Sequence, residues 1–396
     1  MSKSFPKDLF LVEGISHFCF NNNFTQVAIS KKNHIIEIYK IENIKDFSSY
    51  KLLYTLSIHN QYISGLDWHS KTNKILSCSY DKTSFISSYD KNKKNYISEN
   101  VIVSTKLGYL TCSWNNRGDK FVLGSSNRQL IIGYFNKENN WWIGKNIKCH
   151  KSSVTCAKIS PNNLFVISGS IDMKVYISSC YIKDIDEQFI TNDIKNLIKD
   201  FGIVIYEFNM NSWVNCVNFN ENDIGYAASQ NSLFVVLNYK SDKNYIVKLK
   251  HSPFVKILPK KYNEIYAVDY NRNIYLYECL DNKWNIKKIF NKENNNDIEK
   301  SNNNNENNNN SNNNSNNNFI NNSNNKSNNN DYESNNDNES NNNDNESNKN
   351  ENKKENLIIK IKENEKKHST NISSITIKQD EIITTDLAGF VKFWNI

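Results

Sequence analysis

Residues 131–187 read IIGYFNKENNWWIGKNIKCHKSSVTCAKISPNNLFVISGSIDMKVYISSCYIKDIDE, and their second half is the clearest copy of a unit that recurs along the chain. After His150, residues 154–159 alternate with a period of two, which is typical of a strand. The turn Ser-Pro-Asn-Asn and two short apolar strands follow, the second after a turn around Asp172. Such a small sheet cannot bury its faces alone, so it needs neighbours like itself.

The unit occurs seven times. In five copies the last apolar residue of the first strand is Phe20, Trp68, Trp114, Ile159 and Phe219, at steps of 48, 46, 45 and 60 residues. WD-repeat propellers repeat every 40–45 residues or so and have four strands in each blade. The spacing therefore predicts an all-β fold, a seven-bladed WD-repeat β-propeller, because closing the ring removes most exposed strand edges.

The last copy ends at Trp394 with DLAGFVKFW, and only two residues follow it. A blade that stops there lacks its outer strand. We predict that residues 9–12, near the other end of the chain, supply this strand and close the ring. The predicted organisation is blades one to six in residues 1–290, an insert in residues 291–356 and blade seven in residues 357–396.

The insert is a low-complexity segment, in which Asn occupies 30 of the 50 positions in residues 301–350. With so few apolar residues it cannot offset its ordering entropy, so we expect it to be disordered. Residues 291–350 carry four Lys against ten Asp and Glu, a net charge of −6, which leaves +13 for the rest of a chain whose total is +7. This positive charge could attract acidic partners, or it could come from lysines that keep the surface soluble. The lysines are scattered along the sequence and not clustered, which favours the second interpretation.

A second segment, residues 184–208, interrupts the strand pattern. Its apolar residues at 190, 194, 197, 198 and 201 have roughly helical spacing, with Asp193 as a possible N-cap and Gly202 as a possible end. We predict one short helix over the connection between blades four and five.

Motifs of nucleotide-binding loops, zinc proteases and serine hydrolases are absent from the sequence. The eight cysteines form no CxxC pair, which argues against a zinc site and a disulfide framework. We expect no catalytic residues, no metal and no cofactor, hence no enzyme. The first ten residues lack the apolar core of a signal peptide, and no run approaches the ~18 apolar residues of a membrane helix, so we expect no membrane span.

Histidine and aspartate recur together in three copies. The pairs are His59 with Asp81, His150 with Asp172, and His368 with Asp386, the last in the copy that ends at Trp394. A carboxylate in a turn can accept bonds from backbone N–H groups and from the histidine that opens its unit. Catalytic groups would converge on one site, so one pair in each of several units indicates structural ties instead.

The adjacent Trp141 and Trp142 are the most unusual local feature. Neighbouring strand residues point to opposite faces, so one ring should be buried and the other exposed or covered. An exposed Trp makes a good interface anchor. The alternative is that both rings pack under a loop.

Residues 134–148, YFNKENNWWIGKNIK, resemble the subunit 1 family of the actin-related protein 2/3 complex, which has a similar double-Trp segment here. Residues 181–187, YIKDIDE, are similar to the family's AYIKEVDE, and residues 27–34 and 59–68 also match. The resemblance is dense up to residue 187 and thin afterwards. We therefore assign partner binding to Trp141 and Trp142, and also to Tyr134 and Lys145 of the same segment.

The resemblance implies a seven-bladed propeller and a non-catalytic scaffold role in nucleating and branching actin filaments. It also implies the cytoplasm and cytoskeleton as the location, with the other complex subunits, an actin filament and a nucleation-promoting factor as partners. The family carries a short amphipathic helix in the insert between blades six and seven, whereas this chain has an Asn-rich tract there. The alternative function is a free-standing WD-repeat adaptor for nucleic-acid or chromatin factors, although we expect no nucleic acid among the partners.

Overall fold

The computed structural model describes residues 9–10, 14–31, 33–46, 49–190, 192–195, 200–241, 243–281, 283–290, 368, 370–378, 381–388 and 390–396. These residues belong to one compact unit, which spans Met1–Lys292 and Ile358–Ile396. The predicted insert and its expected disorder lie outside the described residues, as do residues 11 and 12 of the predicted closing strand.

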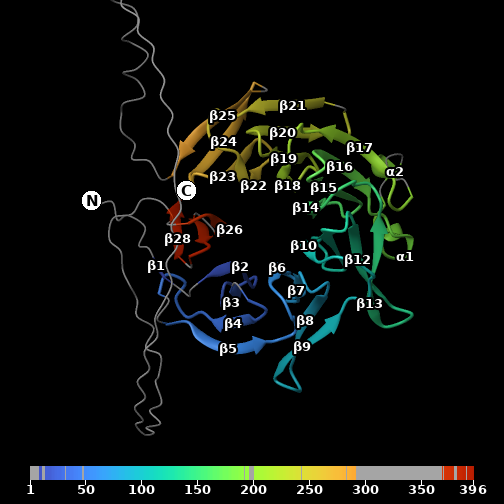
Figure 1. The fold of residues 1–396 in the computed structure, drawn as a ribbon, viewed down its shortest axis with the longest axis vertical. Coiled ribbons are helices and arrows are strands. Elements are labelled where there is room, and N and C mark those ends of the chain that lie inside the picture. The colour runs from blue at the N-terminus through green and yellow to red at the C-terminus, as the bar shows by residue number, and fades with distance from the viewer. Residues whose placement is uncertain are drawn as a thin grey trace, which may run out of the picture. The chain divides into compact units, whose positions relative to one another are not determined.

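Seven four-stranded antiparallel sheets surround a central opening, and the chain passes from one to the next in sequence order (Figure 1). The predicted seven-bladed propeller is confirmed. The first three blades are β2 Ile15–Phe20, β3 Gln26–Lys31, β4 Ile36–Lys40, β5 Lys51–Leu56; β6 Ile63–Trp68, β7 Ile75–Ser79, β8 Ser84–Asp90, β9 Asn95–Asn100; and β10 Tyr109–Trp114, β11 Lys120–Ser125, β12 Leu130–Asn136, β13 Trp141–Ile147.

The remaining four blades follow the same order, and the first strand of each is the innermost. They are β14 Val154–Ile159, β15 Phe165–Ser170, β16 Lys174–Ser179, β17 Val204–Asn209; β18 Val214–Phe219, β19 Gly225–Ser229, β20 Leu233–Asn238, β21 Lys243–Lys248; β22 Phe254–Lys261, β23 Glu264–Asp269, β24 Ile274–Leu280, β25 Lys283–Ile289; and β26 Ile372–Lys378, β27 Glu381–Asp386, β28 Phe390–Asn395 with β1 Leu9–Phe10.

Blade seven is built from both ends of the chain. Strand β1 lies antiparallel to β28, with Leu9 opposite Val391 and Phe10 opposite Phe390. The prediction that an N-terminal strand closes the ring is therefore confirmed for Leu9–Phe10.

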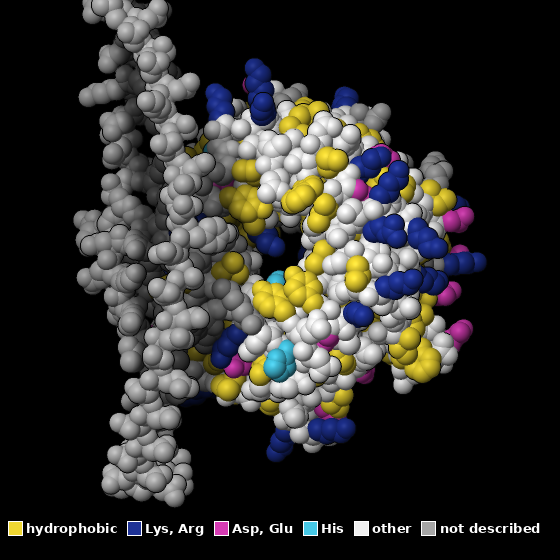
Figure 2. All heavy atoms as spheres, viewed as in Figure 1, with side chains coloured by type: hydrophobic (Ala, Val, Ile, Leu, Met, Phe, Trp, Pro, Cys, Tyr) yellow, Lys and Arg dark blue, Asp and Glu magenta, His cyan; other side chains and the backbone are white. Residues whose placement is uncertain are grey.

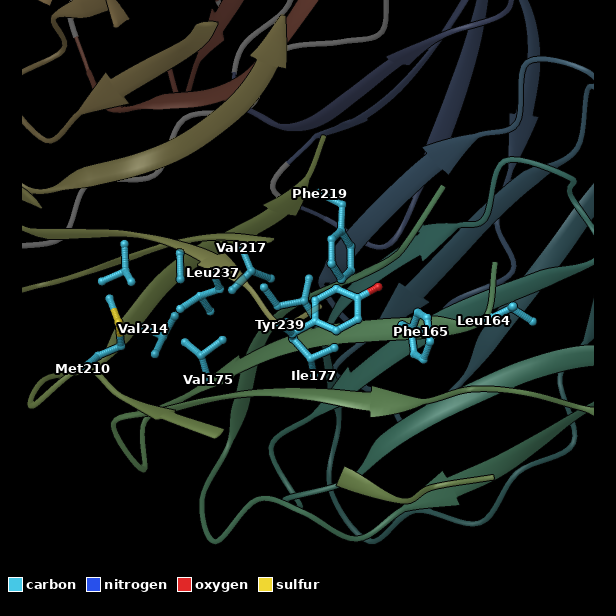
Figure 3. Close-up of a cluster of buried hydrophobic side chains, with 13 residues drawn as sticks. Leu164, Phe165, Val175, Ile177, Met210, Val214, Val217, Phe219, Leu237 and Tyr239 are labelled. Carbon is cyan, nitrogen blue, oxygen red and sulfur yellow. The ribbon is translucent and has the colours of Figure 1, made fainter. Parts of the chain in front are cut away.

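The hydrophobic core lies between neighbouring blades as well as within them. Figure 3 shows the cluster between blades four and five, where Tyr239 lies between Phe219 and Phe165. The ring centroids of Phe165 and Tyr239 are 5.2 Å apart in an edge-on arrangement. The cluster draws Val175 and Ile177 from one blade and Val235 and Leu237 from the next, so the two sheets share one core. Each of these blades therefore depends on its neighbour to bury its apolar face.

Polar side chains join the inner strands across blade boundaries. Each innermost strand has a free backbone edge, which must find hydrogen-bond partners where it is buried. The donors are Ser64 Oγ to the carbonyl of Tyr109 (2.6 Å), Thr155 Oγ1 to that of Val214 (2.7 Å), Asn215 Nδ2 to that of Phe254 (3.0 Å) and Asn218 Nδ2 to that of Ile257 (3.0 Å). Short polar residues at the central opening therefore join blade two to blade three, blade four to blade five, and blade five to blade six.

The turns between second and third strands use non-glycine residues in the left-handed region. In blades two to six this position is held by Lys82, Arg128, Met173, Ser232 and Arg272, with φ between 61° and 71°. An L-residue pays roughly 1–2 kcal/mol for this conformation. The chain has only 11 glycines, so it meets this cost with other residues at a position that recurs in every one of these blades.

The connection between β16 and β17 contains α1 Lys183–Asp186, a 3-10 turn over Glu187–Phe189 and α2 Asn192–Lys195, each about one turn long. Helix α2 includes the predicted N-cap, Asp193, but residues 196–199, the middle of the predicted helix, lie outside the described residues. Ile194 packs on the core of blades four and five, and Phe201 packs on that of blades three and four. No helix in the described part of the chain has the length and apolar character needed to cross a bilayer.

Candidate protein-interaction surfaces

The double-Trp strand β13 forms the outer edge of blade three. Trp142 is buried, at 2% exposure, and its ring lies edge-on to Trp114 at 5.7 Å and to Phe135 at 5.3 Å. Trp141 is 47% exposed. The predicted split between a buried and an exposed Trp is confirmed, and the alternative of two covered rings is excluded.

The neighbourhood of Trp141 limits which predicted contact residues can reach a partner. Tyr134 is buried, at 5% exposure, whereas Lys145 is exposed and holds its Nζ 5.3 Å from the Tyr134 ring. Burial argues against direct contacts by Tyr134 and Trp142, because both rings are committed to the core. Trp141 and Lys145 are the two residues of the set that lie at the surface.

The backbone beside Trp141 is partly covered by the same chain. The N–H of Ile102 donates to the carbonyl of Trp142 at 2.9 Å, and the N–H of Gly144 donates to the carbonyl of Ile102 at 3.1 Å. Ile102 itself is 50% exposed. This segment protects part of the β13 edge and adds an apolar side chain near the exposed Trp.

The three histidine–aspartate pairs lie at the entry of blades two, four and seven. His150 Nδ1 lies 3.0 Å from Asp172 Oδ2, and its Nε2 lies 2.8 Å from Ser168 Oγ. Asp172 Oδ2 also accepts from the N–H of Lys151 at 2.7 Å. Burial acts to raise the pKa of Asp172, but its hydrogen bonds with His150, Lys151 and Lys174 outweigh it and hold that pKa below the usual value.

In blade seven the network is longer. Trp394 Nε1 donates to Thr384 Oγ1 at 2.8 Å, His368 Nε2 lies 2.6 Å from the same oxygen, and His368 Nδ1 lies 3.1 Å from Asp386 Oδ2. Four side chains thus connect the turn, the second strand and the third strand of one blade.

Blade two has an indirect version of the pair. His59 Nδ1 is 2.8 Å from Thr83 Oγ1, which donates to Asp81 Oδ1, and the direct distance from His59 Nδ1 to Asp81 Oδ2 is 3.5 Å. Burial lowers the pKa of His59 to about 4 despite the nearby Asp81. Each of the three pairs stays within its own blade, an arrangement suited to fixing turns and not to a shared reaction centre.

The face formed by these turns and by the loops that enter the blades is both apolar and basic. Exposed hydrophobic residues on its loops are Tyr80, Leu107, Met173, Trp213 and Tyr270, and the ring of Tyr62 stacks on that of Tyr80 at 5.5 Å. Exposed cations on the same loops are Lys82, Lys106, Arg128, Lys148, Lys151 and Lys250. Figure 2 shows hydrophobic side chains around the central opening, with most of the Lys and Arg side chains farther out.

Acidic side chains on the described loops of this face are the turn aspartates 81, 172, 269 and 386, and hydrogen bonds within the chain engage all four. The face therefore offers apolar contact area and uncompensated positive charge. Such a surface favours an acidic protein partner with apolar side chains of its own.

A buried ion cluster, which sequence reasoning missed, joins blades three and four. Lys120 and Asp186 have fully buried side chains, and Lys120 Nζ donates to Asp186 Oδ2 at 2.7 Å. Lys120 Nζ also donates to the carbonyls of Asn163 (2.5 Å) and Cys180 (3.1 Å), and Arg117 donates to the other Asp186 oxygen. Phe189 lies over the Arg117 guanidinium, 4.2 Å from it.

Asp186 belongs to the YIKDIDE stretch, residues 181–187. The sequence contains two signals for this cluster. One is a lysine at the start of an otherwise apolar strand, residues 120–124, and the other is an acidic residue in a connecting segment. Neither residue stands out without the fold, because the two lie 66 positions apart.

Comparisons with known proteins agree with this architecture. The sequence profile described as "WD domain, G-beta repeat" matches residues 50–86 and 142–177. Actin-related protein 2/3 complex subunit 1A-A of Xenopus laevis is 28% identical over 270 residues, which covers 66% of this chain and 70% of that protein. Subunit 1 of Schizosaccharomyces pombe is 26% identical over 275 residues, covering 67% and 71%, and subunit 1A of Arabidopsis thaliana is 33% identical over 175 residues, covering 44% and 45%.

The chain is similar to subunit 1 proteins of the actin-related protein 2/3 complex. The crystal structure of the computationally designed Ika8 protein is also similar, with a TM-score of 0.57, 13% identity, and coverage of 96% of this chain and 83% of that one. At that identity the likeness concerns the fold alone. In this chain the double-Trp strand lies at an exposed blade edge, and the YIKDIDE stretch contributes Asp186 to a buried cluster between blades.

Proposed function

We propose that this chain is the non-catalytic WD-repeat subunit of an actin-related protein 2/3 complex, in the cytoplasm and associated with the actin cytoskeleton. Its role is to hold other subunits in the arrangement that nucleates and branches actin filaments. The observation that carries the proposal is the similarity to subunit 1 proteins of an animal, a yeast and a plant. The closed ring, with hydrogen bonds between several neighbouring blades, supports a scaffold role because it presents several outer surfaces on one fold.

Two surfaces are suited to partners. The edge of blade three offers the half-exposed Trp141. Lys145 lies on the same strand, and Ile102 lies on the segment that pairs with this strand. Large aromatic anchors contribute much of the energy in protein interfaces, so we assign a subunit contact to this edge. The apolar and basic loop face supports contact with an acidic partner, such as an actin filament or a nucleation-promoting factor.

Co-purification tests the proposal. The tagged full chain should recover actin-related proteins and the other complex subunits, identified by mass spectrometry of the native complex. Replacing Trp141 with Ala should reduce that recovery while the purified chain keeps its melting temperature. Recovery of nucleic acid in a salt-sensitive way, without actin-related proteins, would instead support the nucleic-acid adaptor.

A further inference from the structure

A basic pocket lies at the opposite end of the central opening from the loop face. It has a volume of about 200 Å³ and lies where the inner strands β10, β14, β18 and β22 end. Each of these strands begins after a loop on the apolar and basic face and ends in the turn to its second strand. Four blades therefore contribute to one pocket.

Three lysines line this pocket: Lys158 at the end of β14, and Lys260 and Lys261 at the end of β22. Consecutive strand residues normally point to opposite faces. The pairing of β22 with β23 shifts register between Pro259 and Lys261, an irregularity that allows both neighbouring lysines to line the same cavity.

The charge of these lysines is incompletely balanced. Lys158 Nζ donates to the neutral Ser113 Oγ at 2.5 Å, and Lys260 Nζ lies 3.5 Å from Glu264, a carboxylate that also binds Lys287 at 2.6 Å. Lys261 is exposed and contacts no carboxylate among the described residues. Among the described residues that line the pocket, Glu221 alone is acidic.

We infer that this pocket, formed by blades three to six, binds a phosphate monoester group. Lysine ammonium groups bind phosphate as point charges and can each supply up to three donors. A cavity of about 200 Å³ is smaller than a typical drug-sized site, which suits one phosphoryl group and the few atoms that carry it. Asn116 and Asn218 also line the pocket and provide polar walls.

The test is calorimetric titration of the purified full chain at low salt with three probes. These are glucose 6-phosphate, a short neutral peptide with one phosphoserine, and the same peptide without phosphate. Binding of both phosphorylated probes identifies the phosphate group as the recognised element. Binding of only one of them identifies a small metabolite or a modified side chain as its source.

Two substitutions with opposite signs make the test specific. Lys261→Gln should weaken binding at least about tenfold, the loss expected for one charge-assisted hydrogen bond. Glu221→Gln removes the opposing charge and should tighten binding about threefold at low salt. Lys248→Gln, an exposed lysine on the outer strand β21, is the matched control and should leave affinity unchanged.

All three variants alter exposed side chains, so the folded chain should survive, and thermal melting checks this. The inference is overturned if neither phosphorylated probe binds, or if the unphosphorylated peptide binds equally well. It is also overturned if Lys248→Gln weakens binding as much as Lys261→Gln, because general surface charge then explains the result.

Discussion

Removing one charge from the buried cluster between blades three and four should destabilise the whole propeller. Asp186→Asn keeps the shape of the side chain but leaves Lys120, whose side chain has no exposed surface, without its counter-charge. Breaking a buried pair by removing one partner costs about 3–5 kcal/mol. The cost should approach the upper value, because Asp186 also accepts from Arg117 and from the N–H of Ile182 at 2.7 Å.

The expected change in melting temperature follows from the size of the fold. An unfolding entropy of about 2.1 cal/mol/K per residue, over about 300 folded residues, gives ~0.6 kcal/mol/K. A loss of about 3–5 kcal/mol therefore lowers the melting temperature by about 5–8 °C. Thermal melts and urea unfolding of the full chain measure the two quantities independently.

The structure provides a matched control in the same cluster. Asp119 pairs with Arg117 at 2.9 Å, but both side chains are partly exposed, so Asp119→Asn should cost less than about 1 kcal/mol. Combining Lys120→Met with Asp186→Leu replaces the pair by apolar groups and should recover more than half of the lost stability. If Asp186→Asn costs no more than Asp119→Asn, the buried pair does not hold the two blades together.

Four further predictions concern other parts of the chain. Trp142→Ala should cost about 3–5 kcal/mol of stability, whereas Trp141→Ala should cost less than about 1 kcal/mol and reduce subunit recovery. Equal stability losses would show that both rings serve as core residues. Removing Leu9–Phe10 should lower the free energy of unfolding by about 2 kcal/mol, from two lost strand contacts, and unchanged urea unfolding would contradict a closing role. The pKa of His59 is about 4 in the folded chain and higher in the unfolded chain, so the free energy of unfolding should fall as pH drops from about 6.5 to 4. His59→Gln should reduce the slope of unfolding free energy against pH by about one proton, and an unaltered slope refutes this. Deleting residues 295–349 should change stability by less than about 1 kcal/mol, since loop closure costs only ~0.6 kcal/mol per doubling of length, and a large drop in melting temperature would show that the tract is not a passive loop.

The blade pattern could be predicted from sequence because it depends on local order. Strand alternation, turn residues and a near-constant step place the inner strands that end at Trp68, Trp114 and Ile159 where the structure has them. The closing strand followed from counting, since a last copy ending near Trp394 has three strands of its own and needs a fourth. The different burial of Trp141 and Trp142 followed from the two-residue period of a strand.

Features that depend on contacts between distant residues could not be predicted in this way. The meeting of Lys120 with Asp186 requires the relative position of two blades, which no local pattern encodes. In the segment after β16, the contacts of Ile194 and Phe201 with two different inter-blade cores could not be predicted either, because they depend on the positions of neighbouring blades. The basic pocket was also missed, since its lysines come from separate blades and a register shift.

The pairing of Leu9 with Val391 has a consequence for how the protein is made. The two partners are separated by 382 positions, so the ribosome synthesises β1 of the last blade long before it synthesises β28. Blades one to six can assemble on the nascent chain, but β1 cannot pair until β28 has left the exit tunnel. A translation product that stops before residue 390 would keep six complete sheets and an open ring, and its exposed edges would make it a substrate for chaperones or proteases.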